Sequence, residues 1–346
     1  MNNNKIYFLE ILRFFSSLMV VIWHYQHFFL PFNTNAQEKF LNIESSLLII
    51  RGLDIEIGTL GVYIFFGISG VVFSATYLNN GKILLKDYFV KRFARLYPLH
   101  FFTLILVAFI QFLNFYQFNS YEIYFYNDLK HFFLNLFFIS HWGFEDGWSF
   151  NAPIWTVSLE IQVYILFFLV INFLNKSKYM LSFIIIIFFY VLREFFFDTN
   201  KLNAFILFFS GTILYRIYQS EKNQILLILF VLFGSANLIG NFKIILFSLS
   251  IISGFLYLDL ILNINLKKKR FFEFLGNLTY ASYLIHTPIQ LFIIYTINNF
   301  NLRIIRFENI SIFFCFIFIV YFFSYYVFKY FEKPASTWIK KFYPRH

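Results

Sequence analysis

The 346-residue chain contains 60% hydrophobic residues, 57 Phe and only 13% charged residues, whereas an ordinary soluble domain carries about 25% charged residues. This composition excludes a soluble globular fold and predicts an all-α protein that crosses a membrane several times. Because Cys315 is the single cysteine, the chain can form neither a disulfide framework, nor a thiolate metal cluster, nor a Cys-x-x-Cys redox pair.

We predict a bundle of ten membrane helices from apolar stretches that approach the ~20 residues needed to cross a ~30 Å hydrocarbon core. The first stretch carries Glu10, Arg13 and His24 and has no small-residue cleavage site, so we expect it to remain as a span. The two stretches that flank Gly240-Asn241 either cross fully or form a hairpin that does not. The predicted spans are residues 6–31, 57–78, 96–116, 154–174, 179–197, 202–219, 224–240, 243–262, 273–298 and 310–331.

Lysine and arginine predict the orientation of these spans. With the N-terminus in the cytoplasm, nineteen basic residues fall on the inner side and eight on the outer side, so the positive-inside rule places both termini in the cytoplasm. The formal charge of +10 then follows from topology, and a nucleic-acid partner is not expected. The inner residues are Lys5, Lys82, Lys86, Lys91, Arg92, Arg95, Lys176, Lys178, Arg216, Lys222, Lys267, Lys268, Lys269, Arg270, Lys329, Lys333, Lys340, Lys341 and Arg345. The outer residues are Lys39, Arg51, Lys130, Arg193, Lys201, Lys243, Arg303 and Arg306.

The longest predicted loop lies between Gln117 and Asn151 and faces outward in this orientation. Loops of this length in compact proteins are usually functional. Within it, the amphipathic stretch from Leu129 to Ile139 is either an interfacial or a re-entrant helix. No internal repeat stands out along the chain, which weakens the case for a transporter built from inverted repeats.

Arg13 and His24 are the most informative residues of the first span. They are eleven residues apart, so in a helix both side chains lie on one face, ~16 Å apart along the axis. Ionisable groups at membrane depth are costly unless they line a cavity or find partners, which makes the pair a candidate functional site. The alternative is a buried pair with a structural role only.

Glu160 lies in the fourth predicted span, about as far below its outer end as His24 lies in the first. The two side chains can therefore meet at one depth, where a carboxylate would fix the tautomer of the imidazole and raise its basicity. Such a histidine is suited to act as a general base on a hydroxyl group. The alternative is a structural carboxylate bonded to a neighbouring Trp or Tyr.

A basic cluster opens the third predicted span at its cytoplasmic end. Arg92 and Arg95, beside Lys91, are three residues apart and project from one helix face, a geometry suited to bidentate binding of phosphate oxygens. Basic residues at this position are also what topology requires. The cluster therefore serves either a phosphate-bearing ligand or orientation alone.

Two further polar or small-residue features lie inside the spans. Gly61, Gly67 and Gly70 of the second span either let helix backbones approach closely or let a long, thin ligand lie along the helix. Helix packing is the simpler explanation. His286 lies near mid-depth in the ninth span and is either a second polar group of the site or a structural residue.

Six short motifs follow one another along the chain. They are Glu10-x-x-Arg13 with His24, Phe66-Gly67-Ile68-Ser69-Gly70, Arg92-Phe93-x-Arg95-Leu96-Tyr97-Pro98, Pro153-x-Trp155-Thr156-x-Ser158-x-Glu160, Ser282-Tyr283 with His286-x-Pro288, and Phe331-Glu332-Lys333-Pro334. Each motif alone is weak, but the ordered set resembles the acyltransferase-3 family, integral-membrane acyltransferases that modify cell-surface sugars. The resemblance runs from Leu9 to Pro334, nearly the whole chain.

The resemblance implies a single membrane acyltransferase domain over residues 1–346 that moves an acyl group, commonly acetyl from acetyl-CoA, to a hydroxyl of a glycan or of another lipid-linked or small acceptor. It implies that Arg13 and His24 form the essential motif of the first helix, and that Arg92 and Arg95 belong to the donor side. Some members carry an appended SGNH hydrolase-like domain, and we expect none here because the sequence ends soon after the Phe-Glu-Lys-Pro motif.

Two positions depart from the family pattern. Glu10 stands where many members have Asp, which is a mild chemical change. Gly67 stands where many members have a larger apolar residue, so the packing there is expected to differ.

These observations lead to a mechanistic hypothesis for a multi-pass protein of the inner (cytoplasmic) membrane. Acyl-CoA, with no tightly bound cofactor and no metal, would place its phosphates against the basic cluster from the cytoplasm. His24 would deprotonate the acceptor hydroxyl, Glu160 would orient His24, and Arg13 would stabilise the thioester oxyanion or the phosphopantetheine end. The donor-site candidates are Arg92, Arg95, Lys91 and Ser69, and further candidates are Glu10, Trp155, Ser158, Tyr283 and His286.

Two other function classes remain open from the sequence. A transporter or flippase for a lipid-linked sugar would also need Arg, His and Glu inside the membrane. A non-catalytic partner of a polysaccharide assembly system would tolerate the loss of His24. The sequence does not identify the acyl chain or the acceptor, for which a surface polysaccharide such as an exopolysaccharide or a lipopolysaccharide is expected.

Overall fold

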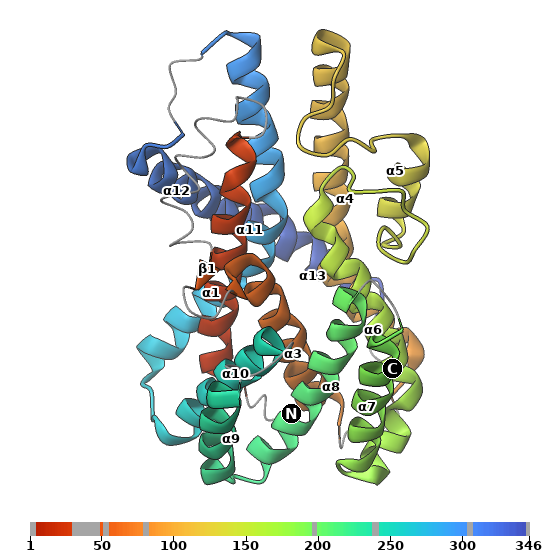
Figure 1. Ribbon diagram of the computed structural model, residues 1–346, viewed down its shortest axis with the longest axis vertical. Helices are drawn as coiled ribbons and strands as arrows, with labels where there is room; N and C mark the ends of the chain where they lie inside the picture. Colours follow the sequence, from red (N-terminus) through yellow and green to blue (C-terminus); the bar gives the residue numbers. More distant parts are fainter. Residues whose placement is uncertain are drawn as a thin grey trace. The chain divides into compact units, whose positions relative to one another are not determined.

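The computed structural model describes residues 5–29, 49–50, 55–78, 83–195, 199–236, 242–302 and 307–343, and helices dominate these ranges (Figure 1). Within them, β structure is limited to the antiparallel pair β1 (Ile49–Ile50) and β2 (Ile55–Glu56). The chain divides into two compact units. The first unit comprises residues 1–20, 49–83 and 159–277, and the second comprises residues 21–48, 84–158 and 278–346.

The first unit is a helical bundle around α3 (Ile57–Tyr77). Its other helices are the first part of α1 (Tyr7–His24), most of α6 (Trp155–Ser177), α7 (Met180–Arg193), α8 (Thr199–Gln219), α9 (Asn223–Ala236), α10 (Lys243–Ile261) and the start of α11 (Leu266–Asn299). α3 packs against α8 and α10, α7 against α8, and α9 against α10. α3 is thus the helix around which this unit is built.

Glycine makes the contact between α3 and α8 possible. A side chain at Gly70 would collide with the backbone oxygen of Phe208, and one at Gly211 would collide with the backbone oxygen of Gly67. On another face of α3, Gly61 lies against the backbone oxygen of Ser16 in α1. Because a Cβ at any of these positions would force the backbones apart, the glycine-rich span serves close helix packing.

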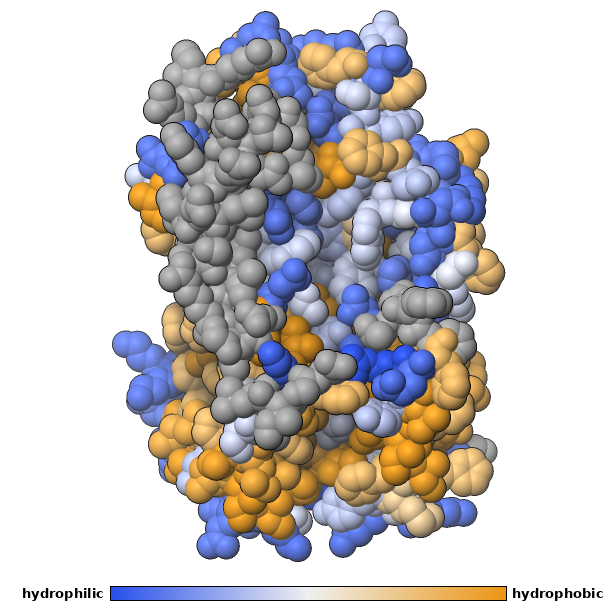
Figure 2. Space-filling model, in the orientation of Figure 1, coloured by the Kyte–Doolittle hydropathy of each residue, from blue (hydrophilic) through white to orange (hydrophobic). Residues whose placement is uncertain are grey.

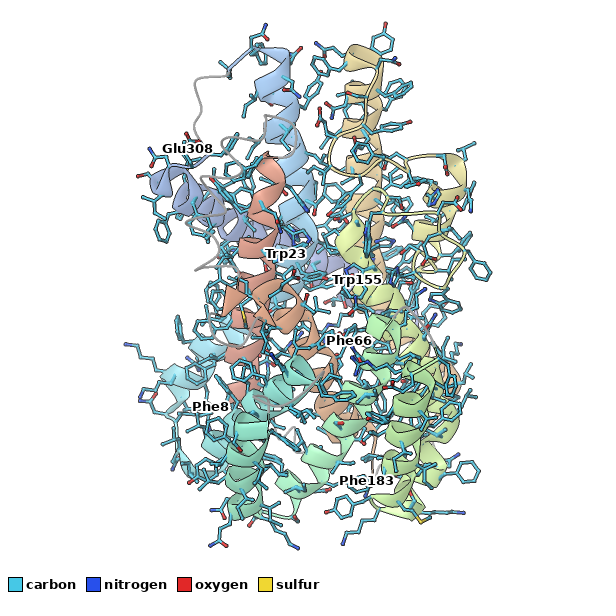
Figure 3. The ribbon with its side chains drawn as sticks, viewed as in Figure 1. Phe8, Trp23, Phe66, Trp155, Phe183 and Glu308 are labelled. Carbon is cyan, nitrogen blue, oxygen red and sulfur yellow. The ribbon has the colours of Figure 1, made fainter. Side chains whose placement is uncertain are left out.

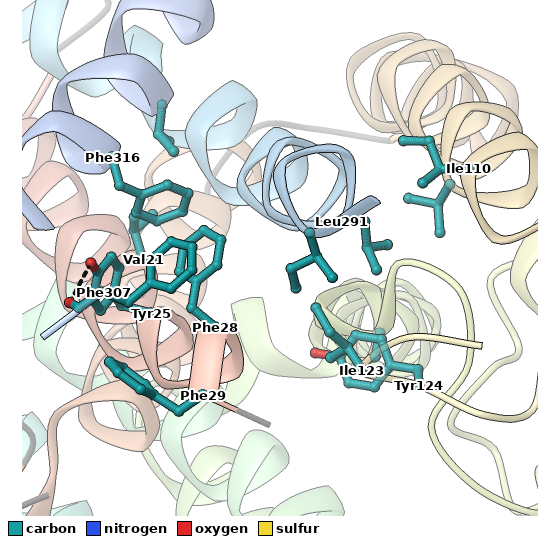
Figure 4. Packing of buried hydrophobic residues seen from close by; sticks show 14 of the residues in the cluster. Val21, Tyr25, Phe28, Phe29, Ile110, Ile123, Tyr124, Leu291, Phe307 and Phe316 are labelled. Carbon is teal, nitrogen blue, oxygen red and sulfur yellow. Dashed lines mark hydrogen bonds between the residues drawn. The ribbon is translucent and has the colours of Figure 1, made fainter. Parts of the chain in front are cut away.

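The second unit contains the end of α1 and the 3-10 turn η1 (Tyr25–Phe29). It also contains α4 (Leu85–Phe118), α5 (Leu129–Leu136), η2 (Ala152–Ile154), the rest of α11, α12 (Ile310–Val327), the π-helical turn η3 (Phe328–Glu332) and α13 (Lys333–Lys341). Its hydrophobic core combines aliphatic and aromatic side chains, among which Phe28 and Phe307 stack with ring centroids 4.4 Å apart (Figure 4). The buried Tyr25 hydroxyl donates a hydrogen bond to the backbone oxygen of Phe307 at 2.9 Å.

The stretch from Leu129 to Ile139 was predicted to be helical, and α5 confirms it over Leu129–Leu136. Asp128 caps this helix by accepting a hydrogen bond from the backbone N–H of His131 at 2.8 Å. Slight burial acts to raise the pKa of Asp128, but the hydrogen bonds from the backbone and ring of His131 and the charges of His131 and Lys130 lower it overall. The cap is therefore stable as a carboxylate.

Each predicted span contains a helix, so the prediction of a helical, multi-pass membrane protein is confirmed. Six helical segments of the described residues are long and apolar enough to cross a membrane, so the count of ten is not confirmed. α7 and α9 have 14 residues each, or ~21 Å, which is short of a ~30 Å hydrocarbon core. The six segments are Tyr7–Phe29, Ile57–Tyr77, Leu85–Phe118, Ala152–Ser177, Lys243–Ile261 and Ile310–Lys341.

The predicted starts of two helices were wrong. α4 begins at Leu85 and α11 at Leu266, well before the predicted residues 96 and 273. Lys, Arg and Glu favour helices as strongly as most apolar residues do, so a charged helical turn escapes a search for apolar stretches. As a result, the basic cluster lies within α4 and does not open it.

The surface of the first unit has the composition expected next to lipid. Phe183, Ile184, Ile187 and Phe188 of α7 are all more than half exposed, and Figure 2 shows hydrophobic residues over much of the visible face of this unit. The predicted orientation stays a prediction. Of the basic residues that support it, Lys39, Arg51, Lys82, Arg303, Arg306 and Arg345 lie outside the described residues, as does Gly240-Asn241.

Candidate functional site

Three histidines meet in the second unit at the junction of α1 and η1. His24 is the last residue of α1, and the 3-10 turn that follows carries His27. The ring centroid of His24 lies 4.7 Å from that of His286 and 5.1 Å from that of His27. Trp23, labelled in Figure 3, packs its indole edge-on against His24 at 4.8 Å and against His27 at 5.9 Å. All three imidazoles are buried, and we call them the histidine cluster.

Helix α11 supplies the groups that hold this cluster in place. The side-chain amide of Gln290 donates a hydrogen bond to the backbone oxygen of His24 at 2.9 Å, which satisfies a carbonyl at the end of α1. One turn earlier, Nδ1 of His286 lies 3.1 Å from the backbone oxygen of Ser282. A backbone carbonyl only accepts, so Nδ1 carries a proton, and in the neutral imidazole Nε2 then has a free lone pair.

Two ring nitrogens of the cluster, Nε2 of His286 and Nδ1 of His27, have no hydrogen-bond partner among the described residues. Buried polar atoms are rarely left without one. A substrate hydroxyl, able both to donate and to accept, is the kind of group that would satisfy them. His286, predicted to be either a second polar group of the site or a structural residue, thus lies beside His24.

Tyr283 joins the start of α6 to α11. Its hydroxyl donates to the backbone oxygen of Pro153 at 2.9 Å and lies 2.8 Å from Oγ1 of Thr156. One residue further along α11, the backbone oxygen of Leu284 accepts a hydrogen bond from the side-chain amide of Asn151 at 2.9 Å. Because its hydroxyl contacts both Pro153 and Thr156, Tyr283 links α11 to the start of α6.

Trp155 and Ser158 belong to a second group of side chains in the same unit. The ring of Trp155, labelled in Figure 3, lies 5.3 Å from that of His141. Ser158 accepts two hydrogen bonds from the loop before it, one to Oγ from the backbone N–H of His141 at 3.2 Å and one to its backbone oxygen from Nε1 of Trp142 at 3.1 Å. Both residues therefore face the loop between α5 and α6.

The basic cluster of α4 is larger than predicted. Helix α13 packs against α4, and the positive charges of Arg95, Arg92 and Lys91 all act on Lys340 of α13. Lys340 therefore adds a fourth positive charge to the predicted group of three. The arrangement suits a ligand with several phosphate charges.

Glu160 lies in the first unit, where both of its carboxylate oxygens are hydrogen-bonded. Ser69 of α3 donates to Oε1 at 2.8 Å, and Tyr164, one turn along α6, donates to Oε2 at 2.7 Å. Ser69, predicted at the donor site, is thus a partner of Glu160. His24 belongs to the second unit, so the orienting role of Glu160 stays a prediction.

Arg13 also lies in the first unit and has an acidic partner, as a charge at membrane depth requires. Its guanidinium lies 3.4 Å from the carboxylate of Glu10, and the ammonium of Lys5 lies 3.6 Å from that carboxylate and 3.0 Å from Glu273. Gly276 of α11 leaves room for Glu10, because a side chain at that position would collide with the carboxylate. The motif Glu10-x-x-Arg13 is therefore an ion pair on one face of α1.

Comparison with protein families matches residues 6–329 to the acyltransferase domain of the acyltransferase-3 family. The chain belongs to the acyltransferase-3 family. Comparison with curated proteins and with solved structures gave no match. Together with its apolar helices, membership of the family makes the protein a membrane acyltransferase.

The structure brings further residues beside the predicted candidates of this acyltransferase. His27, three residues after His24, could have been found from spacing, since residues three apart share a helix face. Lys340 stands in the sequence as one of the basic residues on the inner side. His141, beside Trp155, lies in a loop, where no periodic pattern indicates which side chains meet. In the part of the chain that the structure describes, no group of three His, Cys, Asp or Glu side chains is arranged to hold a metal ion.

Proposed function

We propose that this acyltransferase moves an acyl group, most simply acetyl, from acyl-CoA to a hydroxyl of a surface polysaccharide or lipid-linked sugar at the inner (cytoplasmic) membrane, with His24 as the general base. The observation that carries the proposal is the packing of His24 against His286 and His27. Three imidazoles this close cannot all be protonated, because their like charges repel. At least one stays neutral and can accept a proton from a hydroxyl.

The chemical step needs one proton acceptor and one proton donor. His24 takes the proton of the acceptor hydroxyl while the oxygen of that hydroxyl attacks the thioester carbonyl. A carbon–oxygen bond forms and the carbon–sulfur bond breaks. The proton then passes from the imidazolium to the thiolate of CoA. His286, in ring contact with His24, can share this proton during the step.

The basic cluster is the proposed binding site for the phosphates of CoA. Arginine presents two parallel N–H groups that match phosphate geometry, and Lys91 and Lys340 add charge beside Arg92 and Arg95. Arg13 and Glu160 keep the roles predicted for them from the sequence.

Transfer of radiolabelled acetyl groups tests the proposal directly. The purified protein in lipid nanodiscs would receive acetyl-CoA labelled in its acetyl group, together with a membrane lipid extract and a panel of methyl glycosides as acceptors. The expected result is labelled ester in a sugar-containing product, with one CoA released per ester formed. Movement of a lipid-linked sugar across the bilayer with the label remaining on CoA would favour a flippase instead.

A further inference from the structure

The loop between α5 and α6 holds an aromatic and acidic cluster that the proposed reaction does not use. The indole of Trp148 stacks on the ring of His141 with centroids 5.4 Å apart and planes 14° from parallel. Trp155 packs against both, at 5.3 Å from His141 and 6.1 Å from Trp148. Trp148 is nevertheless 49% exposed. The exposed part of the Trp148 indole therefore forms a flat apolar surface beside His141.

A carboxylate completes this cluster. Oε1 of Glu145 lies 3.3 Å from Nδ1 of His141, and their side chains are only 14% and 13% exposed. The other carboxylate oxygen, Oε2, accepts a hydrogen bond from the backbone N–H of Gly143 at 2.7 Å. A carboxylate has about four acceptor positions, so Glu145 can accept hydrogen bonds in addition to these. We call His141, Glu145, Trp148 and Trp155 the loop cluster.

The loop cluster is fixed in place by the residues around it. Ser158 of α6 holds the backbone of His141 and the indole N–H of Trp142. Gly143 has a φ of +96°, which favours glycine. A side chain at Gly147 would collide with the ring of Tyr126. A surface held this firmly loses little conformational freedom on binding a ligand.

We propose that the loop cluster is a binding subsite for a sugar ring, in which a pyranose stacks on Trp148 while its hydroxyls bond to Glu145 and His141. A pyranose has one largely apolar C–H face and a rim of hydroxyls that donate and accept. That combination matches an exposed indole face beside a carboxylate and an imidazole. The inference rests on the proposed function, which names a sugar acceptor, and adds a docking position for that sugar.

A lipid surface is the competing occupant, because exposed aromatic residues also gather at membrane interfaces. The same region already has a separate apolar stripe for that purpose. Leu129, Phe133 and Phe137, spaced four residues apart along and just after α5, are all more than half exposed. An aromatic anchor in lipid needs no carboxylate and imidazole packed beside it. The chemistry of the loop cluster thus favours a sugar.

Binding of methyl glycosides to the whole protein tests the inference. The protein would be purified without alkyl-glycoside detergents, whose sugar headgroups would compete, and placed in phosphatidylcholine nanodiscs. The probes are the methyl glycosides of glucose, galactose, mannose and N-acetylglucosamine, followed by saturation-transfer NMR and titration. The variants are Trp148→Ala, Trp148→Phe and Glu145→Gln, with Phe144→Ala as the matched control because Phe144 is an exposed aromatic of the same loop outside the loop cluster.

We expect at least one glycoside to bind the parent and Trp148→Ala to weaken its binding about tenfold or more. Trp148→Phe should fall between the two, Glu145→Gln should weaken binding, and Phe144→Ala should match the parent. The parent and all four variants should bind CoA equally well, and this result would show that the variants are folded. The inference is wrong if no glycoside binds the parent, or if Trp148→Ala binds it equally well.

Two further measurements separate this inference from its rivals. Quenching by brominated lipid that is lost in Trp148→Phe and unaffected by glycoside would make the loop cluster a bilayer anchor and overturn the inference. Glycoside binding that depends on Trp148, without any acetyl transfer, would contradict the proposed function and leave the subsite standing. Acetyl transfer with an unchanged KM for the sugar in Trp148→Ala would support the proposed function and contradict the subsite.

Discussion

The imidazole of His24, at the end of α1, lies 4.7 Å from that of His286, in the middle of α11. The contact joins two predicted candidates from opposite ends of the chain. His286 is completely buried, and its Nδ1 is fixed by the backbone oxygen of Ser282. We therefore propose that this pair handles the proton during acyl transfer.

Replacing His24 should nearly abolish acyl transfer. Loss of a general base typically costs about 10²–10⁴-fold in rate, so His24→Asn should lower kcat by that factor with little change in the KM for acetyl-CoA. His286→Asn should have a smaller effect, because it acts through His24. His100→Gln is the control, since His100 is a buried histidine of the same unit that bonds to the backbone oxygen of Asn135. Equal activity of His24→Asn and the parent would remove His24 from the mechanism.

The hydrogen bonds of Glu160 allow its role to be measured in steps. Glu160→Gln should lower kcat by roughly 10–100-fold, since a positioning residue matters less than the base it serves. Ser69→Ala and Tyr164→Phe each remove one donor to the carboxylate and should have smaller effects in the same direction. If Ser69→Ala instead raises only the KM for acetyl-CoA, Ser69 contacts the donor and does not act through Glu160.

Neutralising the basic cluster should weaken donor binding. Arg92→Ala and Arg95→Ala should each raise the Kd for CoA by about tenfold or more, because charge-assisted contacts to phosphate are lost. Their residual binding should depend less on salt. Arg92→Lys should restore binding only in part, since lysine lacks the bidentate fork. Lys86→Ala, on the same helix, is the control. If Lys86→Ala loses as much CoA affinity as Arg92→Ala, basic residues attract the phosphates non-specifically and the basic cluster is not a specific site.

A methyl group at the crossing of α3 and α8 should destabilise the first unit. In Gly70→Ala the new Cβ would collide with the backbone oxygen of Phe208, and overpacking of this kind costs about 1–3 kcal/mol. Thermal unfolding in detergent would show a lower Tm. Gly234→Ala is the control, because a Cβ there meets only the flexible hydroxyl of Ser250 at 3.2 Å. Equal Tm values for both variants would contradict the packing role of Gly70.

Cysteine labelling should decide the sidedness predicted from basic residues. In a Cys315→Ser background, a cysteine at the exposed Lys178 should react only from the cytoplasm, and one at the exposed Ser120 only from outside. Both positions lie between helices, so their substitution should leave the fold intact. Reversed labelling would overturn the orientation. Correct labelling together with acylation of a strictly cytoplasmic acceptor would keep the orientation and reject transfer across the membrane.

The sequence by itself determined the class of this protein and the order of its functional segments. Composition requires burial in a bilayer, and apolar stretches locate the helices because the hydrophobic effect acts on local composition. Arg13, His24 and Glu160 stood out because charge is costly inside a membrane. The same reasoning misplaced the start of α4, since its first turns are charged yet helical.

Only the tertiary structure decided which of these residues meet. It grouped His24 with His286 and His27, gave Ser69 to Glu160, and added Lys340 to the basic cluster. Such pairings depend on how distant segments pack, and side-chain periodicity carries no information about the partner helix. The loop cluster shows most clearly that sequence periodicity does not identify the partners of a side chain. It is held by a turn at Gly143 and by hydrogen bonds to Ser158, contacts that exist only once the chain has folded.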